Sequence, residues 1–168
     1  QVKAYDPAYA YEIAIIVREG LQRMFYDNYE EYYYIAVGNE NYTQPTMPSS
    51  NKKLDEHVLK GMYLFNERNI KNTSTHVALL GSGAIHKEVV KAQKLLEKYD
   101  VSSEVWSVTS YTELRREALE IERWNILNPT KKQKKSHIAN VIDSNVDLVV
   151  ASSDYLKSLP DLIAKWLP

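Results

Sequence analysis

The sequence predicts an α/β fold in which a mostly parallel sheet carries helices on both faces. Two observations lead to this prediction. Short runs such as Val77–Leu80 and Leu148–Ala151 are apolar throughout, which is typical of strands buried on both faces. Longer segments between these runs repeat apolar residues every three or four positions, which indicates helices packed along one side. Because such strands alternate with such helices along the chain, we expect parallel pairing.

The composition is that of an ordinary globular protein and excludes several classes of function. The 168 residues suffice for one domain or two small lobes, and 44% of them are hydrophobic. The 21 Lys and Arg residues nearly balance the 22 Asp and Glu residues, so we expect no nucleic-acid partner. The chain has no cysteine, which excludes disulfides, thiolate metal sites and cysteine nucleophiles.

The chain shows no targeting or membrane signal. The first residues lack the order of a signal peptide, and the longest wholly apolar run, Ile13–Val17, is too short to span a bilayer. We therefore expect no membrane partner and a cytoplasmic location, which the lack of cysteine fits. The chain starts at Gln1 and stops at Pro168, just after an apolar helix pattern. We expect both ends to be boundaries within a longer protein.

The first part of the chain predicts one helix, one strand and a loop. Asp6 and Pro7 are typical of a helix start, because Asp caps free amides and Pro suits the first helical position. The strand is expected over Tyr32–Val37 and the loop over Asn39–Lys53, which contains two prolines. The expected buried stripe of the helix is Ala10, Ile13, Ala14, Val17, Leu21 and Met24, widened by Ile15 and Ile16.

The second part predicts strands and helices in alternation. Strand Val77–Leu80 is followed by a helix, strand Val105–Val108 by two helices, and strand Leu148–Ala151 by a last helix. Ser110 and Glu113 form a capping box at the start of the second helix. The residues that mark the buried faces are Ile85, Val89, Ala92, Leu96, Tyr99, Leu114, Ala118, Ile121, Ile138, Val141, Ile142, Leu159, Leu162, Ile163 and Trp166.

Three features are candidates for chemistry. The Gly81-Ser82-Gly83 turn joins a strand to a helix and fits either an anion site or a tight turn without a ligand. The segment Asn39–Pro45 is the densest polar cluster and follows a strand, so it fits either a functional loop or a turn. Four histidines lack the spacing of metal ligands, so we expect surface or cap roles for them and no metal site. They are His57, His76, His86 and His137.

Longer strings in the sequence closely resemble one family. They are YDPAYAYE at 5–12, YYYIAVGNENYTQPTMP at 32–48, LGSG at 80–83, VWSVTSYTELRREALEIERWN at 105–125 and ASSDYLKSLPDLI at 151–163. These strings resemble the homodimeric bacterial pyruvate dehydrogenases, in their decarboxylating component. The resemblance covers nearly the whole chain in the same order, and the tyrosine-rich and tryptophan-containing strings are specific to this branch of the transketolase-like enzymes.

The resemblance implies a transketolase C-terminal-like sheet preceded by a helix-strand remnant of the middle domain. Residues 1–46 would end the pyrimidine-binding middle domain, 47–57 would be a linker, and 58–168 would be most of the C-terminal domain. The family's cofactor-activating glutamate lies upstream, and its Gly-Asp-Gly motif does not occur here. We therefore expect this fragment alone to be inactive and to bind neither thiamine diphosphate nor magnesium. The first part is too small for its own core, so we expect it to pack on the second part or on another copy.

The resemblance also suggests which residues reach the substrate side of the family's active site. Thr43 stands where well-studied members carry a histidine. A threonine hydroxyl donates a hydrogen bond but does not exchange a proton near neutral pH. No catalytic set is complete in this chain, and no metal ligand is expected. The candidate substrate-binding residues are Tyr5, Asn39, Glu40, Asn41, Tyr42 and Thr43.

The implied function is that of a larger enzyme. Such a protein would use thiamine diphosphate and magnesium to decarboxylate pyruvate and would pass the acetyl unit to lipoyl groups. Its partners would be a second copy in a homodimer and the dihydrolipoyl acyltransferase component with its lipoyl domains. Two alternatives remain open: a stand-alone, non-catalytic α/β interaction module, and another transketolase-like enzyme.

Overall fold

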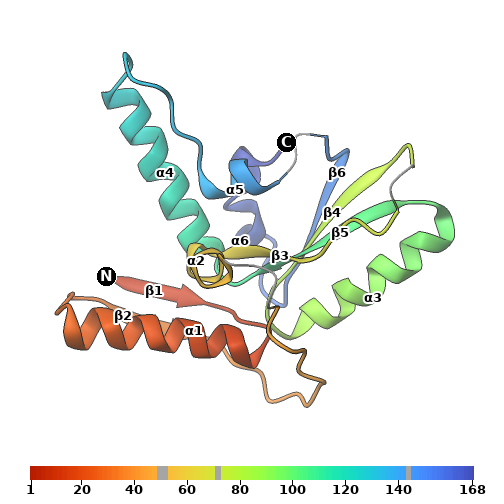
Figure 1. Cartoon of the computed structure of the whole chain (residues 1–168), viewed down its shortest axis with the longest axis horizontal. Helices are drawn as coiled ribbons and strands as arrows, with labels where there is room; N and C mark the ends of the chain where they lie inside the picture. Colours follow the sequence, from red (N-terminus) through yellow and green to blue (C-terminus); the bar gives the residue numbers. More distant parts are fainter. Residues whose placement is uncertain (49–52, 71–72, 143–144) are drawn as a thin grey trace.

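The computed structural model describes residues 1–48, 53–70, 73–142 and 145–168, and it confirms the α/β fold. Its strands form a sheet of four and a sheet of two (Figure 1). The first segment, residues 1–48, contains the small sheet, and the second segment, from residue 53 onward, contains the large one. Within the described ranges, no helix has both the length and the apolar character that crossing a membrane requires.

The large sheet is mostly parallel, as predicted. It consists of β3 (Met62–Asn66), β4 (His76–Gly81), β5 (Ser102–Val108) and β6 (Leu148–Ser152), in the spatial order β3-β5-β4-β6. Strand β4 runs parallel to both β5 and β6, whereas β3 is antiparallel to β5. Every residue of β4 is buried, which fits an apolar strand with neighbours on both sides.

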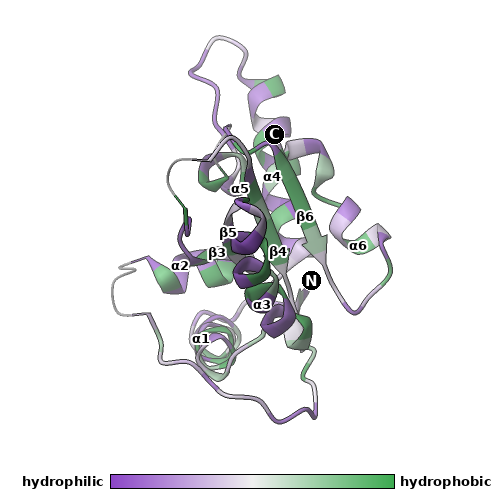
Figure 2. Ribbon diagram, turned by 90° about the vertical axis from the view of Figure 1, so that its right-hand side faces the viewer, coloured by the Kyte–Doolittle hydropathy of each residue, from purple (hydrophilic) through white to green (hydrophobic). Residues whose placement is uncertain are grey.

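Helices cover both faces of this sheet. Helix α3 (His86–Leu96) packs on one face, and α4 (Tyr111–Leu127), α5 (His137–Val141) and α6 (Ser158–Asp161) lie on the other (Figure 1). The strands β4 and β6 between them are predominantly hydrophobic (Figure 2). The second face carries the larger apolar core, whose fully buried members include Met62, Ala78, Leu80, Val108, Leu114, Ile138 and Ile163.

Short helical turns extend several of these helices. They are the π-helical η1 (Gln22–Tyr26) and the 3-10 turns η2 (Gly83–Ile85), η3 (Glu97–Tyr99) and η4 (Ala164–Trp166). Half of the predicted capping box of α4 is present: the Ser110 hydroxyl accepts a hydrogen bond from the Glu113 N–H at 3.1 Å, whereas the Ser110 N–H donates to the Gly61 carbonyl at 3.0 Å. The turns therefore lengthen helices that apolar spacing already indicated.

The first segment contains one strand more than predicted. Strand β1 (Val2–Tyr5) pairs in parallel with β2 (Tyr32–Ile35), and α1 (Ala10–Leu21) connects them. The expected strand end at Val37 is also wrong, because pairing with β1 stops at Ile35. Strand β1 has only four residues and includes a lysine, so its own pattern is weak; pairing with β2 makes it a strand.

Helix α1 begins later than predicted and buries a different face. Its N-cap is Tyr9 and not Asp6, because the chain stays extended after β1 and the Asp6 N–H donates to the Thr109 carbonyl at 2.8 Å. None of the six residues of the predicted stripe is buried, and Val17 and Leu21 are 42% and 49% exposed; only the widening residues Ile15 and Ile16 are buried. The buried residues of α1 are Glu12, Ile15, Ile16 and Gly20.

Two further expectations about burial are wrong. Strand β6 was expected to be buried on both faces, but it is the edge strand of the large sheet, and Leu148 is 55% exposed. Tyr99, expected on the buried face of its helix, is 78% exposed. Helix α2 (Leu54–Lys60) begins inside the stretch 47–57 that was expected to be a linker. Residues 49–52 of that stretch lie outside the described residues.

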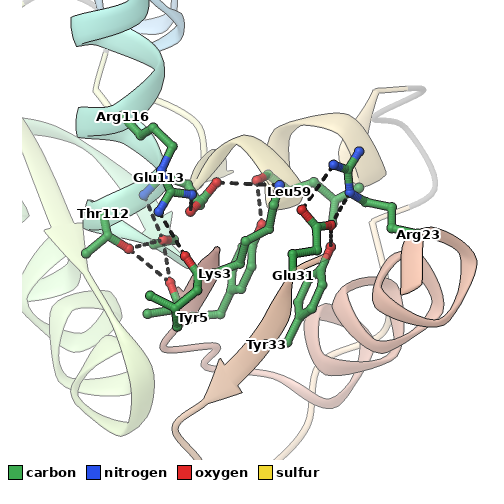
Figure 3. Close-up of polar contacts among 12 residues, drawn as sticks. Lys3, Tyr5, Arg23, Glu31, Tyr33, Leu59, Thr112, Glu113 and Arg116 are labelled. Carbon is green, nitrogen blue, oxygen red and sulfur yellow. Dashed lines mark hydrogen bonds and ion pairs between the residues drawn. The ribbon is translucent and has the colours of Figure 1, made fainter. Parts of the chain in front are cut away.

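The first segment packs on the second, as expected for a unit too small to form its own core (Figure 3). The Tyr5 hydroxyl donates to the Leu59 carbonyl of α2 at 2.9 Å. The Ser110 hydroxyl at the start of α4 donates to the Ala4 carbonyl at 2.6 Å. Lys3 lies 3.7 Å from Glu113, measured between charged atoms. Polar contacts therefore join β1 to α2 and α4.

Candidate functional site

The ends of strands from both sheets meet at one junction. After β1, the Asp6 N–H donates to the Thr109 carbonyl at 2.8 Å, and the Gly83 N–H donates to the Asp6 carbonyl at 3.1 Å. Thr109 directly follows β5, and Gly83 follows β4 by two residues. Ligands of open α/β sheets bind beyond the carboxyl ends of strands, so a site is expected near this junction.

The Gly81-Ser82-Gly83 turn lies against a carboxylate of the chain itself. Gly83 has a φ of +53°, and a Cβ at this position would lie 2.5 Å from Oδ1 of Asp6, so glycine is required here. Burial raises the pKa of Asp6, and a hydrogen bond with Ser82 acts in the opposite direction. Of the two interpretations left open by the sequence, the tight turn explains this geometry, because Asp6 occupies the space beside Gly83.

The polar loop Asn39–Thr43 lies at the surface close to the start of α3. Its members are exposed except for Tyr42, which is half-buried. The Tyr42 hydroxyl donates to the Ala8 carbonyl, and Oε1 of Gln44 accepts from the Ala10 N–H at 3.0 Å. Glu40 forms an ion pair with Lys87 of α3. The exposed amide, carboxylate and hydroxyl groups of the loop are available to bind a small polar molecule.

Thr43 borders a surface cavity between this loop and α3. The Lys87 ammonium lies 5.3 Å from the centre of the Tyr42 ring, a cation–π contact. Lys91 pairs within its own helix with Glu88 at 2.9 Å. The cavity is lined by Tyr9, Tyr42, Thr43, Lys87, Glu88 and Lys91. The lining combines hydroxyl groups with two cations and one carboxylate, and each cation is paired with a carboxylate of the chain, Lys87 with Glu40 and Lys91 with Glu88.

None of the described contacts of Tyr5 is with the loop. Its side chain is 3% exposed, its ring stacks on Tyr33 with centroids 6.1 Å apart, and its hydroxyl donates to the Leu59 carbonyl. Burial, the largest cause, and nearby Glu113 raise its pKa well above the usual range. The structure thus gathers the loop residues at one place and directs Tyr5 toward α2.

Two residues that the sequence did not point to, Tyr9 and His86, lie next to the loop. The Tyr9 hydroxyl and Nδ1 of His86 are 2.8 Å apart. His86 is fully buried, and burial lowers its pKa to about 4, so the ring is neutral near pH 7. The two residues are separated by 77 positions in the sequence. No local pattern relates residues so far apart, so no signal in the sequence pointed to this pair.

Glu12 of α1 is a second overlooked residue, with a fully buried carboxylate. One oxygen accepts from the Ala8 N–H at 2.6 Å and the Tyr9 N–H at 3.1 Å. The other accepts from the Tyr63 hydroxyl at 2.6 Å and the Ser107 hydroxyl at 2.7 Å. Burial raises the pKa of Glu12, and these four hydrogen bonds oppose the shift. Glu12 therefore joins the start of α1 to strands β3 and β5.

The expectation of surface or cap roles for the histidines is wrong for three of them. His76, His86 and His137 are buried, and the rings of His57 and His137 lie 4.9 Å apart. Their side chains are buried because each lies on a helix or strand that packs against an apolar core. Among the residues that the structure describes, no three His, Cys, Asp or Glu side chains come together as a metal site.

Family models match the two segments separately. Residues 61–166 match the transketolase-like C-terminal domain, and residues 1–45 match the middle domain of the pyruvate dehydrogenase E1 component. The chain also resembles solved transketolases. It aligns with a transketolase variant from Pichia stipitis with a TM-score of 0.56 and 12% identity, covering 98% of this chain and 23% of the other. At that identity the likeness concerns the fold alone.

Curated relatives match over nearly the whole chain. It is 46% identical over 167 residues to the pyruvate dehydrogenase E1 component of Pseudomonas aeruginosa, covering 99% of this chain. It is 42% identical over 167 residues to that of Escherichia coli, covering 98% of this chain. In both cases the match spans 18% of the relative, so the chain corresponds to about a fifth of these proteins.

Proposed function

Because this chain belongs to the family of transketolase-like C-terminal domains, we propose that it is a segment of a pyruvate dehydrogenase component that decarboxylates pyruvate. The observation that carries this proposal is the order of the two matches. A middle-domain match over residues 1–45 precedes a C-terminal-domain match over residues 61–166, and relatives of one name cover both. We propose the same division for this chain, with 1–46 and 58–168 as the domain parts and 47–57 between them.

Thiamine diphosphate with magnesium would supply the electron sink for loss of carbon dioxide from pyruvate. The sequence has no Gly-Asp-Gly motif, which is the diphosphate and magnesium motif of the family that the chain resembles. What it does offer fits the substrate side. The loop presents side-chain amides and a hydroxyl beside the cavity at α3. We propose that the cofactor is held by other parts of the longer protein.

Each candidate residue then has a role consistent with its contacts. Asn39, Asn41 and Thr43 are exposed and can donate hydrogen bonds to the carboxylate or keto oxygen of pyruvate. Tyr42 supports the loop through its bond to Ala8. Tyr5 contributes through its position, because its hydroxyl is engaged by α2.

The role of Glu40 follows from its charge. Its hydrogen bond with Lys87 keeps the pKa of this carboxyl below the usual range, so Glu40 is ionised near neutral pH and can accept a hydrogen bond. An ionised carboxylate repels the carboxylate of pyruvate. We therefore assign Glu40 to orienting the other loop groups and not to holding the substrate carboxylate.

The proposed partners follow from the same relatives. We propose that the longer protein forms a homodimer and transfers the acetyl unit to lipoyl groups of a dihydrolipoyl acyltransferase component. We also propose that it acts in the cytoplasm. The names of the relatives, each an E1 component of pyruvate dehydrogenase, support this assignment.

The test is an assay of the full-length protein that contains this chain. With thiamine diphosphate and magnesium, it should consume pyruvate and reduce an artificial electron acceptor. Turnover of a sugar-phosphate donor in place of pyruvate would show another transketolase-like enzyme. Turnover of neither, with a folded protein, would favour a non-catalytic interaction module. Calorimetry on the 168-residue chain should show no cofactor binding, and micromolar binding would contradict the proposed division of the site.

A further inference from the structure

We propose that Lys87 is a positioning residue that holds Glu40, and with it the Asn39–Thr43 loop, in the substrate-binding conformation. The inference rests on the proposed function for the identity of the substrate. The contact itself is independent of that function. It joins residues 47 positions apart and links the first segment to α3 of the second.

The backbone that carries Lys87, at the start of α3, is held in place. It lies in the first turn of α3, whose start is tied to the first segment at two neighbouring positions. The Gly83 N–H donates to the Asp6 carbonyl at 3.1 Å, and His86 bonds with the Tyr9 hydroxyl at 2.8 Å. Because His86 is fully buried, the backbone next to Lys87 has little freedom to move.

The loop, in contrast, is held by a few side chains. Tyr42 attaches it to Ala8 just before α1, the adjacent Gln44 bonds to the first residue of α1, and Glu40 attaches it to Lys87. The Lys87 side chain is 30% exposed and the Glu40 side chain 56% exposed. Lys87 also lies over the Tyr42 ring at 5.3 Å, so one cation contacts two members of the loop. Lys87 thereby transmits the fixed position of α3 to the loop.

The size of the effect follows from the exposure of the pair. An exposed ion pair shifts an equilibrium by a few-fold at most, about fivefold at the upper end. If the loop binds substrate only when ordered, the apparent affinity falls by the factor by which the ordered population falls. We therefore expect loss of Lys87 to raise the pyruvate KM about two- to fivefold and to change kcat less than about twofold.

The experiment uses the full-length protein and two measurements. Hydrogen exchange of the backbone amides of the loop reports its order without any catalysis, and steady-state kinetics report KM and kcat for pyruvate. Lys87→Ala should speed exchange and raise KM, and Lys87→Glu should do both more strongly because it opposes Glu40. Lys87→Arg should retain both values.

Two variants make the result specific. Lys91→Ala removes a cation from the same helix and cavity, but Lys91 pairs with Glu88, so loop exchange should stay unchanged. The double variant Lys87→Glu with Glu40→Lys restores an opposite pair and should restore slow exchange. Rapid exchange that persists in the double variant would overturn the proposal.

Two other outcomes would also overturn it. One is loop exchange unaffected by Lys87→Glu. The other is faster exchange with unchanged KM in Lys87→Ala, which would show a contact without a role in substrate binding. If the full-length protein fails to use pyruvate, the proposed function falls, and the exchange measurements still decide whether Lys87 holds the loop.

Discussion

The two segments of the molecule are stabilised in different ways. The second segment surrounds its sheet with apolar side chains, and Leu80, Leu114 and Ile138 are fully buried there. The first segment is joined to the second by a smaller apolar cluster that includes Ile16, Leu54 and Val58. It is also joined by the buried carboxylate of Glu12 and the hydroxyls that donate to it. An apolar core tolerates substitutions of similar size, whereas a buried polar junction depends on each of its partners.

The segments also differ in what they leave exposed. On the outer face of the small sheet, Tyr32 and Tyr34 are 62% and 63% exposed. Phe25, at the end of α1, is 76% exposed. A parallel sheet normally has both faces covered, so these side chains are suited to contact with more protein. Such exposure agrees with the proposal that the first segment is part of a larger domain.

The largest expected effect is at the polar junction around Glu12. Glu12→Ala removes the acceptor of four buried donors, and each unsatisfied donor costs about 1–3 kcal/mol. We expect it to lower the free energy of opening of β3 and β5 by about 4 kcal/mol or more, measured by native-state hydrogen exchange. Tyr63→Phe removes one of the four donors to Glu12 together with the bond between the Tyr63 and Tyr11 hydroxyls, and it should cost about 1–2 kcal/mol. A Glu12→Ala cost below that of Tyr63→Phe would contradict the picture of a polar junction.

The second prediction concerns the apolar core and is to be compared with the effect of Glu12→Ala. Leu114→Ala leaves a cavity beneath α4, and buried Leu→Ala changes cost about 2–5 kcal/mol. We expect about 3 kcal/mol in the opening free energy of β5, and less than about 1.5 kcal/mol for the similar-sized change Leu114→Met. Exposed Leu119 on the same helix is the control, since Leu119→Ala should have a small effect. Equal costs at Leu114 and Leu119 would show that α4 is not held by this core.

The third prediction concerns pH and the buried His86. Its pKa is about 4 in the folded protein, against 6.5 for a free histidine, so the unfolded state binds a proton at higher pH than the folded state. The stability that the neutral ring contributes is complete above pH 6.5 and is lost as the pH falls toward 4. The loss should reach about 3 kcal/mol.

The stability difference between pH 7 and pH 4.5 should therefore shrink in a His86→Leu variant, measured by hydrogen exchange in α3 and β4. His57→Leu is the comparison, because burial lowers the pKa of His57 less strongly. An unchanged pH dependence in His86→Leu would mean that His86 is not the group responsible.

The smallest expected effect lies at the surface of the candidate site. Thr43→Ala removes one neutral hydrogen bond, which is worth about 1 kcal/mol. Turnover of the full-length protein should fall less than about tenfold, with the larger share in the pyruvate KM. If Thr43 only shapes the turn before Pro45, steady-state kinetics will be almost unchanged while the melting temperature falls slightly. A thousandfold loss without unfolding would reveal a role beyond a single hydrogen bond.

Part of the candidate site followed from the sequence and part did not. The loop Asn39–Thr43 stood out as a dense polar cluster after a strand, and its strings resemble one family. Lys87, Tyr9 and His86 had no comparable signal. In the sequence, Lys87 looks like any other lysine on a helix. Its pairing with Glu40 depends on how the two segments pack. Sequence spacing relates neighbours along one element and does not relate residues on different elements.

The elements with strong local patterns were predictable from the sequence alone. The apolar run Val77–Leu80 indicated a strand, and Ser110 followed by Glu113 indicated a helix start from local hydrogen bonding. Three features were not predictable in this way: strand β1, the buried face of α1 and the exposure of β6. The physical reason is that a short strand, or a helix apolar on several sides, is settled by the partner it meets, and those partners lie far away along the chain.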